Sequence, residues 1–102
     1  MAGPSPALRT VHILIEGRVQ GVGFRAFVER EAMALDLAGW VRNRRTGAVE
    51  AILSGPDGSV EIVLGACRRG PQGARVDAVF VIADVDSERL GTFQGFAVHP
   101  TV

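Results

Sequence analysis

The chain has 102 residues and a mass of 10.8 kDa, which is the size of a single domain. Hydrophobic residues make up 47% and charged residues 22%, so the chain can form a hydrophobic core and does not have the composition of a disordered protein. Its 11 basic residues are all arginine and balance 11 acidic residues, so the net charge favours neither nucleic acid nor an anionic membrane as a partner.

Several kinds of chemistry are disfavoured by residues that are absent or rare. Without lysine, the chain has no Schiff-base nucleophile and no Walker-type phosphate lysine. The single cysteine, Cys67, cannot form an internal disulfide or a cysteine cage for zinc. His12 and His99 lie far apart and have no acidic residue at ligand spacing, so we expect neither a metal site nor a cofactor. No apolar run reaches the roughly 18 residues of a membrane span, and the start does not resemble a secretory signal. Because the sequence has no disulfide framework, we predict a cytoplasmic protein.

The first third of the chain predicts a strand, a glycine-rich loop and a helix. Residues 1–7 are expected to form a flexible tail, and residues 8–102 a single domain. Apolar and polar residues alternate over Leu8–Glu16, which predicts a strand. Gly17–Gly23 is rich in glycine and is typical of a loop. From Phe24 the apolar spacing becomes helical, and we predict a helix from about Gly23 to Leu35 or Asp36.

The next segment predicts a β-hairpin. Strands are expected at Leu37–Arg42 and Ala48–Leu53, joined by a turn at Asn43–Gly47 that ends in glycine. Residues Ser54–Gly58 are expected to break the chain before a second helix begins.

The second helix and the last two strands complete the predicted elements. Apolar residues at helical spacing run from Val60 to Cys67, and Gly70–Pro71 is expected to stop this helix. A long strand is predicted at Arg75–Val85 and a short one at Phe93–Val98.

The order of these elements predicts an α+β fold, the ferredoxin-like split βαβ (βαββαβ) sandwich, with an antiparallel sheet and two helices on one face. The first strand is expected beside the strand that follows the hairpin. The Gly17–Gly23 loop and the hairpin turn should then meet at one end of the sheet. Because this layout hosts many functions, it does not itself predict an activity.

The Gly17–Gly23 loop has the composition of an anion site. Glycines let successive backbone N–H groups turn inward, and the following helix adds its positive end. Arg25, in the first turn, can add a planar guanidinium to the same anion. A tight connection without function gives the same pattern, and neither the P-loop nor the dinucleotide spacing is present. An asparagine such as Asn43 is likewise common in structural turns, and the arginines at 42, 44 and 45 are typical of a solvated turn.

Two long segments make a more specific pattern together. One is Ile15–Arg25 (IEGRVQGVGFR), and the other is Gly39–Asn43 (GWVRN), followed by Gly47–Val49 and Gly55. With these motifs, and with Gly70–Val76 (GPQGARV), the sequence closely resembles the acylphosphatase family. The likeness extends over about Leu8 to Val98, and the family's fold is the sandwich predicted above.

The resemblance implies metal-independent hydrolysis of the carboxyl–phosphate bond of acyl phosphates to a carboxylate and orthophosphate. It assigns phosphate binding to Arg25 and the attacking water to Asn43. It also implies a phosphate cradle of backbone N–H groups contributed by Gln20, Gly21, Val22, Gly23, Phe24 and Arg25. Gln20 is expected to act through its backbone rather than its side chain. Small acyl phosphates are the expected substrates, with phosphate or sulfate as ligand, no nucleic-acid or membrane partner, and a monomeric chain.

Three other functions remain open at this stage. The main alternative is a non-catalytic regulatory module that binds a small molecule on the same fold. An RNA-binding module would need exposed aromatic residues on the central strands, which Leu8–Glu16 and Ala48–Leu53 lack. An acylphosphatase-like domain that serves a carbamoyl-transfer maturation protein would need further segments that this sequence does not contain.

Overall fold

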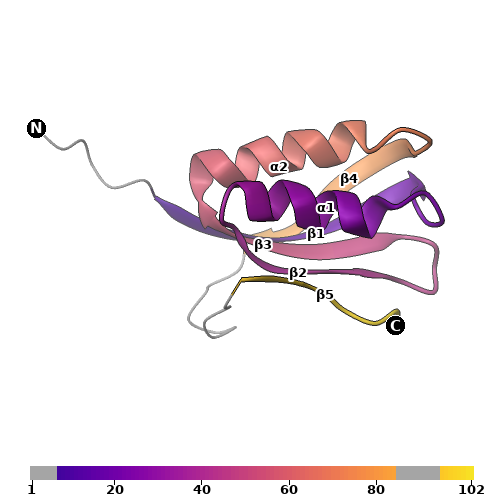
Figure 1. Cartoon of the computed structure of the whole chain (residues 1–102), viewed down its shortest axis with the longest axis horizontal. Helices are drawn as coiled ribbons and strands as arrows, with labels where there is room; N and C mark the ends of the chain where they lie inside the picture. The colour runs from indigo at the N-terminus through magenta and orange to yellow at the C-terminus, as the bar shows by residue number, and fades with distance from the viewer. Residues whose placement is uncertain (1–6, 85–94) are drawn as a thin grey trace, which may run out of the picture.

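A computed structural model describes residues 7–84 and 95–102 of the chain. The elements are β1 (Leu8–Arg18), α1 (Phe24–Ala34), β2 (Ala38–Asn43), β3 (Val49–Pro56), α2 (Asp57–Arg69), β4 (Arg75–Asp84) and β5 (Phe96–Val98). The strands form one sheet in the order β4-β1-β3-β2-β5. Figure 1 shows both helices side by side over the same face of this sheet. The predicted ferredoxin-like α+β sandwich is therefore confirmed.

The sheet is mixed, whereas the sequence analysis predicted an antiparallel one. The pairs β1–β3, β1–β4 and β2–β3 are antiparallel as expected. The short β5 pairs with β2 in parallel. The physical reason is topological: β4 ends beside the start of β1, and β5 begins beside the start of β2, at the same end of the sheet. The last strand therefore runs opposite to β4, which is the direction of β2.

Element boundaries differ most at the predicted break of Ser54–Gly58. There β3 continues through Pro56, because Gly55 and Pro56 pair with Arg9 and Leu8 at the start of β1. The helix α2 then begins directly at Asp57, whose carboxylate lies at the positive end of the helix dipole.

Three predictions fall wholly or partly outside the described residues. They are most of the flexible tail, the last residue of the predicted strand 75–85, and the first two residues of the predicted strand 93–98. No helix in residues 7–84 and 95–102 is long and apolar enough to cross a membrane.

The hydrophobic core lies between the sheet and the two helices. Alternate residues of β1 point into it, and so do the apolar stripes of α1 and α2; the fully buried members include Val11, Ile13, Ile15, Val28, Val60 and Val63. Burying each such side chain contributes about 1.5–3 kcal/mol. Cys67 is buried there, as expected of a small apolar residue, and burial raises the pKa of its thiol to about 12.

The register of β1 and β3 decides where the candidate site forms. Ile15 pairs with Val49, so the last residues of β1 lie beside the first residues of β3. The β1–α1 loop and the β2–β3 turn consequently lie at the same end of the sheet (Figure 1). This adjacency was predicted from the split βαβ topology, and the structure confirms it.

Candidate active site

The β1–α1 loop has a backbone that requires glycine at two positions. Gly21 has φ 75° and Gly23 has φ 78°, which is the left-handed region that L side chains rarely adopt. An added Cβ would meet no atom within 4 Å at either position, so the backbone conformation, not a lack of space, makes glycine the suitable residue. Gly23 is the N-cap of α1, and its carbonyl accepts the first helical hydrogen bond from the Phe27 N–H at 3.0 Å.

The N-terminus of α1 is open to an anion. No side chain among the described residues caps the first turn, and that turn contains no acidic residue. Its backbone N–H groups have no partner within the helix, and they lie at the positive end of the helix dipole. This combination of orphan donors and positive potential suits a phosphate group.

A cavity of about 330 Å³ lies between this loop and the end of β2. It is lined by Val19, Gln20, Gly21, Gly23, Phe24, Arg25, Ala26, Glu29, Asn43 and Val98. The structure therefore brings Arg25 and Asn43 together, with four other residues predicted for the cradle. Val22, the remaining predicted cradle residue, is not among the lining residues and packs partly buried against the core. The chemical roles assigned to these residues stay predictions.

Arg25 is the cationic side chain of this cavity. Its guanidinium is half-buried and, within the part of the chain that the structure describes, has no ion pair and no hydrogen bond. Its charge is therefore not neutralised by a neighbouring carboxylate there. Glu29, one helical turn further along α1, also lines the cavity and was missed by the sequence analysis, although its spacing of four from Arg25 is a sequence signal for proximity.

Asn43 is the last residue of β2 and is held through its backbone on two sides. It pairs with Val49 of β3 on one side. On the other side, its carbonyl accepts a hydrogen bond from the Val102 N–H at 3.2 Å, and the Val102 carbonyl accepts one from the Arg45 N–H at 2.9 Å. No role was expected for residues 99–102 from the sequence. In the structure, the backbone of His99 and Val102 forms hydrogen bonds along the edge of β2, and these bonds fix the position of Asn43.

Gln20 connects the loop to the hairpin turn through its side chain. Its Nε2 donates hydrogen bonds to the carbonyls of Arg44, at 2.6 Å, and Ala48, at 2.9 Å. The same turn is closed by a hydrogen bond from the Arg44 N–H to the Ala48 carbonyl at 2.8 Å. The expectation that Gln20 acts through its backbone alone was wrong in this respect, because its side chain sets the spacing between the loop and the turn.

A cluster of charged residues lies on the sheet face opposite the helices. Glu50 of β3 is buried, with 6% exposure. Its carboxylate accepts hydrogen bonds from Arg42 Nε at 2.7 Å and Arg44 Nη1 at 3.2 Å, and His12 Nε2 lies 2.5 Å from its other oxygen. Burial raises the pKa of Glu50, but hydrogen bonds from Arg42 and His12 outweigh burial and hold the pKa below its ordinary value of 4.5.

This cluster corrects two expectations from the sequence. Arg42 and Arg44 were expected to be solvated turn residues, yet both bind a buried carboxylate, and the Arg42 guanidinium lies 4.5 Å from the centre of the Trp40 ring. No acidic residue lies near His12 at ligand spacing in the sequence, yet His12 is half-buried and paired with Glu50 in the structure. The sequence spacing of these residues does not predict their contacts with Glu50, because the cross-strand register decides which side chains meet. Arg45 is exposed, as expected.

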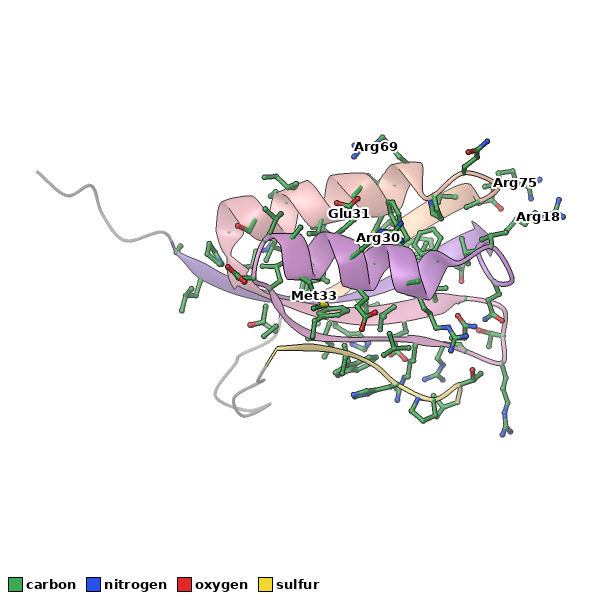
Figure 2. The ribbon with its side chains drawn as sticks, viewed as in Figure 1. Arg18, Arg30, Glu31, Met33, Arg69 and Arg75 are labelled. Carbon is green, nitrogen blue, oxygen red and sulfur yellow. The ribbon has the colours of Figure 1, made fainter. Side chains whose placement is uncertain are left out.

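A second, shallower cavity of about 670 Å³ opens beside the β1 end and the hairpin turn. Arg18 and Arg75, paired across β1 and β4, line it, and Figure 2 shows both side chains at the outer end of the molecule. Glu16 and Asp77 line the same cavity, and Asp77 accepts a hydrogen bond from Arg75 at 3.2 Å. Because Arg75 is already paired with Asp77, whereas Arg25 has no ion pair in the described structure, this surface is less suited to an anion than the first cavity. Within residues 7–84 and 95–102, no group of three or more His, Cys, Asp or Glu residues could hold a metal ion.

Comparison with known proteins gives a consistent result. The acylphosphatase family model matches residues 11–98. An acylphosphatase from Azorhizobium caulinodans is 48% identical over 93 residues, which cover 91% of this chain and 97% of that protein. One from Rhodopseudomonas palustris (strain BisB18) is 61% identical over 64 residues, which cover 63% of this chain and 65% of that protein. The crystal structure of acylphosphatase from Bacillus subtilis superposes with a TM-score of 0.79 at 35% identity, covering 91% of this chain and 99% of that one.

Proposed function

Because the chain belongs to the acylphosphatase family and is accordingly a hydrolase of acyl phosphates, we propose that it cleaves the carboxyl–phosphate bond by direct attack of water. The single observation that carries this mechanism is that Arg25 and Asn43, from different elements, line one cavity with the glycine-rich loop.

The phosphate is bound by the cradle. Its oxygens accept hydrogen bonds from the backbone N–H groups of Gln20 to Arg25, and the Arg25 guanidinium adds a charged, bidentate donor. The left-handed conformations of Gly21 and Gly23, the open N-terminus of α1 and the lack of an ion pair to Arg25 in the described structure support this assignment. These donors are in place before the substrate arrives, so little reorganisation is needed as charge builds on the transferred group.

The attacking water is held by the side-chain amide of Asn43. The amide oxygen accepts a hydrogen bond from the water and so orients the water, with a lone pair of the water oxygen directed at phosphorus. The water oxygen forms a bond to phosphorus, while the bond between phosphorus and the acyl oxygen breaks and its electron pair leaves with the carboxylate. One proton of the water is then lost to solvent.

This small set of residues is sufficient because of the leaving group. A carboxylic acid has an ordinary pKa of about 4, so the departing carboxylate is stable near neutral pH and needs no general acid. The phosphoryl transition state is loose, so early deprotonation of the water is not required. Positioning and charge stabilisation therefore account for the catalysis.

The proposal also covers the ligands, the cellular location and the oligomeric state of the protein. Small acyl phosphates are the substrates, and inorganic phosphate or sulfate competes for the cradle. We place the protein in the cytoplasm, because its only cysteine is buried and unpaired, which suits a reducing compartment. Its small size and balanced charge are compatible with a monomer. Analytical ultracentrifugation tests the oligomeric state directly.

The test is phosphate release from benzoyl phosphate in the presence of a chelator. Asn43→Ala should lower kcat by about 10²–10³ while the inhibition constant of inorganic phosphate stays unchanged. Arg25→Ala should impair both quantities. Arg30→Ala, which removes an exposed arginine from the same helix, is the matched control and should behave as the parent (Figure 2).

Two outcomes would contradict this function. Turnover at the parental rate by both Arg25→Ala and Asn43→Ala would refute the assignment of the site. Tight binding of a metabolite by the parent protein, without any phosphate release, would favour the regulatory module. Hydrolysis in ¹⁸O-water adds a separate check, since attack at phosphorus labels the phosphate, and attack at the acyl carbon labels the carboxylate.

A further inference from the structure

We infer that Glu50 is a positioning residue for the reaction, which holds the β2–β3 hairpin so that Asn43 faces the cavity. This inference rests on the proposed function, because it assumes that Asn43 holds the attacking water. Glu50 itself lines no part of the cavity and acts from the opposite face of the sheet.

The alternation of side chains along β2 connects the open face of the sheet, where Glu50 lies, with the helix-covered face, where the cavity lies. Successive residues of a strand point to opposite faces of its sheet. Arg42 and Arg44, on either side of Asn43, both reach Glu50 on the open face. Asn43 lines the cavity on the helix face. Fixing its two neighbours on one face therefore fixes the direction of Asn43 on the other.

A single oxygen atom makes this connection. Glu50 Oε1 accepts from both Arg42 Nε, at 2.7 Å, and Arg44 Nη1, at 3.2 Å. Arg42 pairs with Glu50 directly across the β2–β3 ladder, whereas Arg44 lies beyond the end of β2. The bond to Arg44 thus adds a side-chain contact to the turn, beside the backbone hydrogen bond from the Arg44 N–H to the Ala48 carbonyl.

The other oxygen of Glu50 connects the turn to the strand that carries the cradle. Glu50 Oε2 lies 2.5 Å from His12 Nε2, and His12 is on β1. The cradle follows directly from the far end of β1. One carboxylate therefore contacts both strands that supply the site, β1 through His12 and β2 through Arg42.

Burial strengthens the hydrogen bonds of the Glu50 cluster and makes its geometry rigid. The Glu50 side chain is 8% exposed, and its partners Arg42 and His12 are 25% and 28% exposed. Arg42 is further held over the Trp40 ring, and His99 stacks on that ring at 5.3 Å. Charge-assisted hydrogen bonds in such a partly dry environment are strong and have defined directions. Loss of the Glu50 carboxylate should make the β2–β3 turn more mobile and leave the conformation of the cradle unchanged.

The experiment is a double-mutant cycle with benzoyl phosphate as substrate. Glu50→Leu, which is similar in size and cannot accept a hydrogen bond, should lower kcat by about 10- to 100-fold with KM and the inhibition constant of phosphate unchanged. Glu50→Gln keeps an acceptor for the arginines and should restore most of kcat. In the Asn43→Ala background, Glu50→Leu should have no further effect on kcat, because the residue through which it acts is already gone.

The matched control is Glu61→Leu. It removes a carboxylate that binds Arg9 at the opposite end of β1, and kcat should stay at the parental value. If Glu50→Leu does not fold, Arg44→Met removes only the contact to the turn, and the same loss of kcat at constant KM is expected from it.

The outcomes separate this inference from the proposed function. If Asn43→Ala loses activity while Glu50→Leu or Arg44→Met retains the parental kcat, the inference is wrong and the proposed function stands. If the Glu50→Leu effect on kcat multiplies with that of Asn43→Ala, Glu50 does not act through Asn43, and the inference is again overturned. If Asn43→Ala retains the parental kcat, this inference fails together with the assignment of the attacking water to Asn43.

Discussion

The two halves of the candidate site are built in different ways. The cradle, residues 20–25, owes its shape to the main chain, through two left-handed glycines and the start of α1. The hairpin turn, residues 43–48, is held from outside, by the Gln20 side chain, the Glu50 carboxylate and the backbone of Val102. In the proposed mechanism, phosphate binding is thus encoded locally, whereas placement of the water depends on distant residues.

This difference has a kinetic consequence. Changes in the cradle should affect substrate binding and turnover together, because the proposed cradle would contact phosphate in the ground state and the transition state. Changes in the supports of the turn should lower kcat and leave KM unchanged, because they disturb only the group that places the water. The following predictions test this division.

The largest effect is expected from Arg25→Lys. Lysine keeps the positive charge but loses the planar pair of donors, so kcat/KM should fall by about 100-fold and inorganic phosphate should inhibit more weakly. Steady-state kinetics with benzoyl phosphate measures both. Full activity of Arg25→Lys would mean that charge alone, without bidentate geometry, is enough at this position.

The next effect concerns Gly21→Ala in the cradle. The left-handed backbone at φ 75° costs an alanine about 1–2 kcal/mol, so the free energy of unfolding should fall and the inhibition constant of phosphate should rise. Gly58→Ala is the matched control. Gly58 lies in α2, has no left-handed φ and has open space at its Cβ, so this variant should be as stable as the parent or more stable. Equal stability changes for the two variants, measured by urea unfolding, would contradict the conformational explanation.

A smaller effect is expected from Gln20→Ala, which removes the side-chain hydrogen bonds between the cradle and the hairpin turn. The Ala48 carbonyl still accepts a hydrogen bond from the Arg44 N–H, so loss of the two side-chain hydrogen bonds should lower the free energy of unfolding by only about 0.5–1.5 kcal/mol. It should reduce kcat more than it changes KM. Gln72→Ala, at an exposed position, should change neither quantity. A rise in KM at constant kcat would show that Gln20 supports the cradle and not the turn.

The smallest effect is a pH dependence of stability that comes from Glu50. Its folded-state pKa lies below the ordinary value of 4.5, so the ionised carboxylate contributes stability that is fully present above pH 4.5. This contribution is lost as the pH falls through the lower folded-state pKa. The parent should therefore be more stable than Glu50→Gln at pH 7, and the gap should narrow below pH 4.5. A gap that widens on acidification would contradict the direction of the shift.

The sequence predicted the glycine-rich loop between β1 and α1 well because its signals are local. Three glycines between a strand pattern and a helix pattern indicated a loop that bends sharply, and Gly21 and Gly23 do take left-handed conformations. The meeting of Arg25 with Asn43 followed from the order of elements, since a split βαβ topology places the first loop and the hairpin turn at one end of the sheet.

The supports of the turn could not be predicted in the same way. Gln20 meets Arg44 across 24 positions, and His12 meets Glu50 across 38. Such contacts depend on strand register and on which face each side chain takes, and a shift of one residue would separate them. The last strand was predicted, but its parallel pairing was missed for a related reason, since three residues of extended chain carry no signal for the direction in which they pair.

The central claim is that Arg25 and Asn43 act on opposite sides of one phosphate group. A crystal structure with inorganic phosphate bound tests it most directly. We predict the anion in the 330 Å³ cavity, bound by the backbone N–H groups of the cradle and the Arg25 guanidinium, with an ordered water between the anion and the Asn43 amide. Phosphate bound instead between Arg18 and Arg75, or an Asn43 side chain directed away from the anion, would contradict the account.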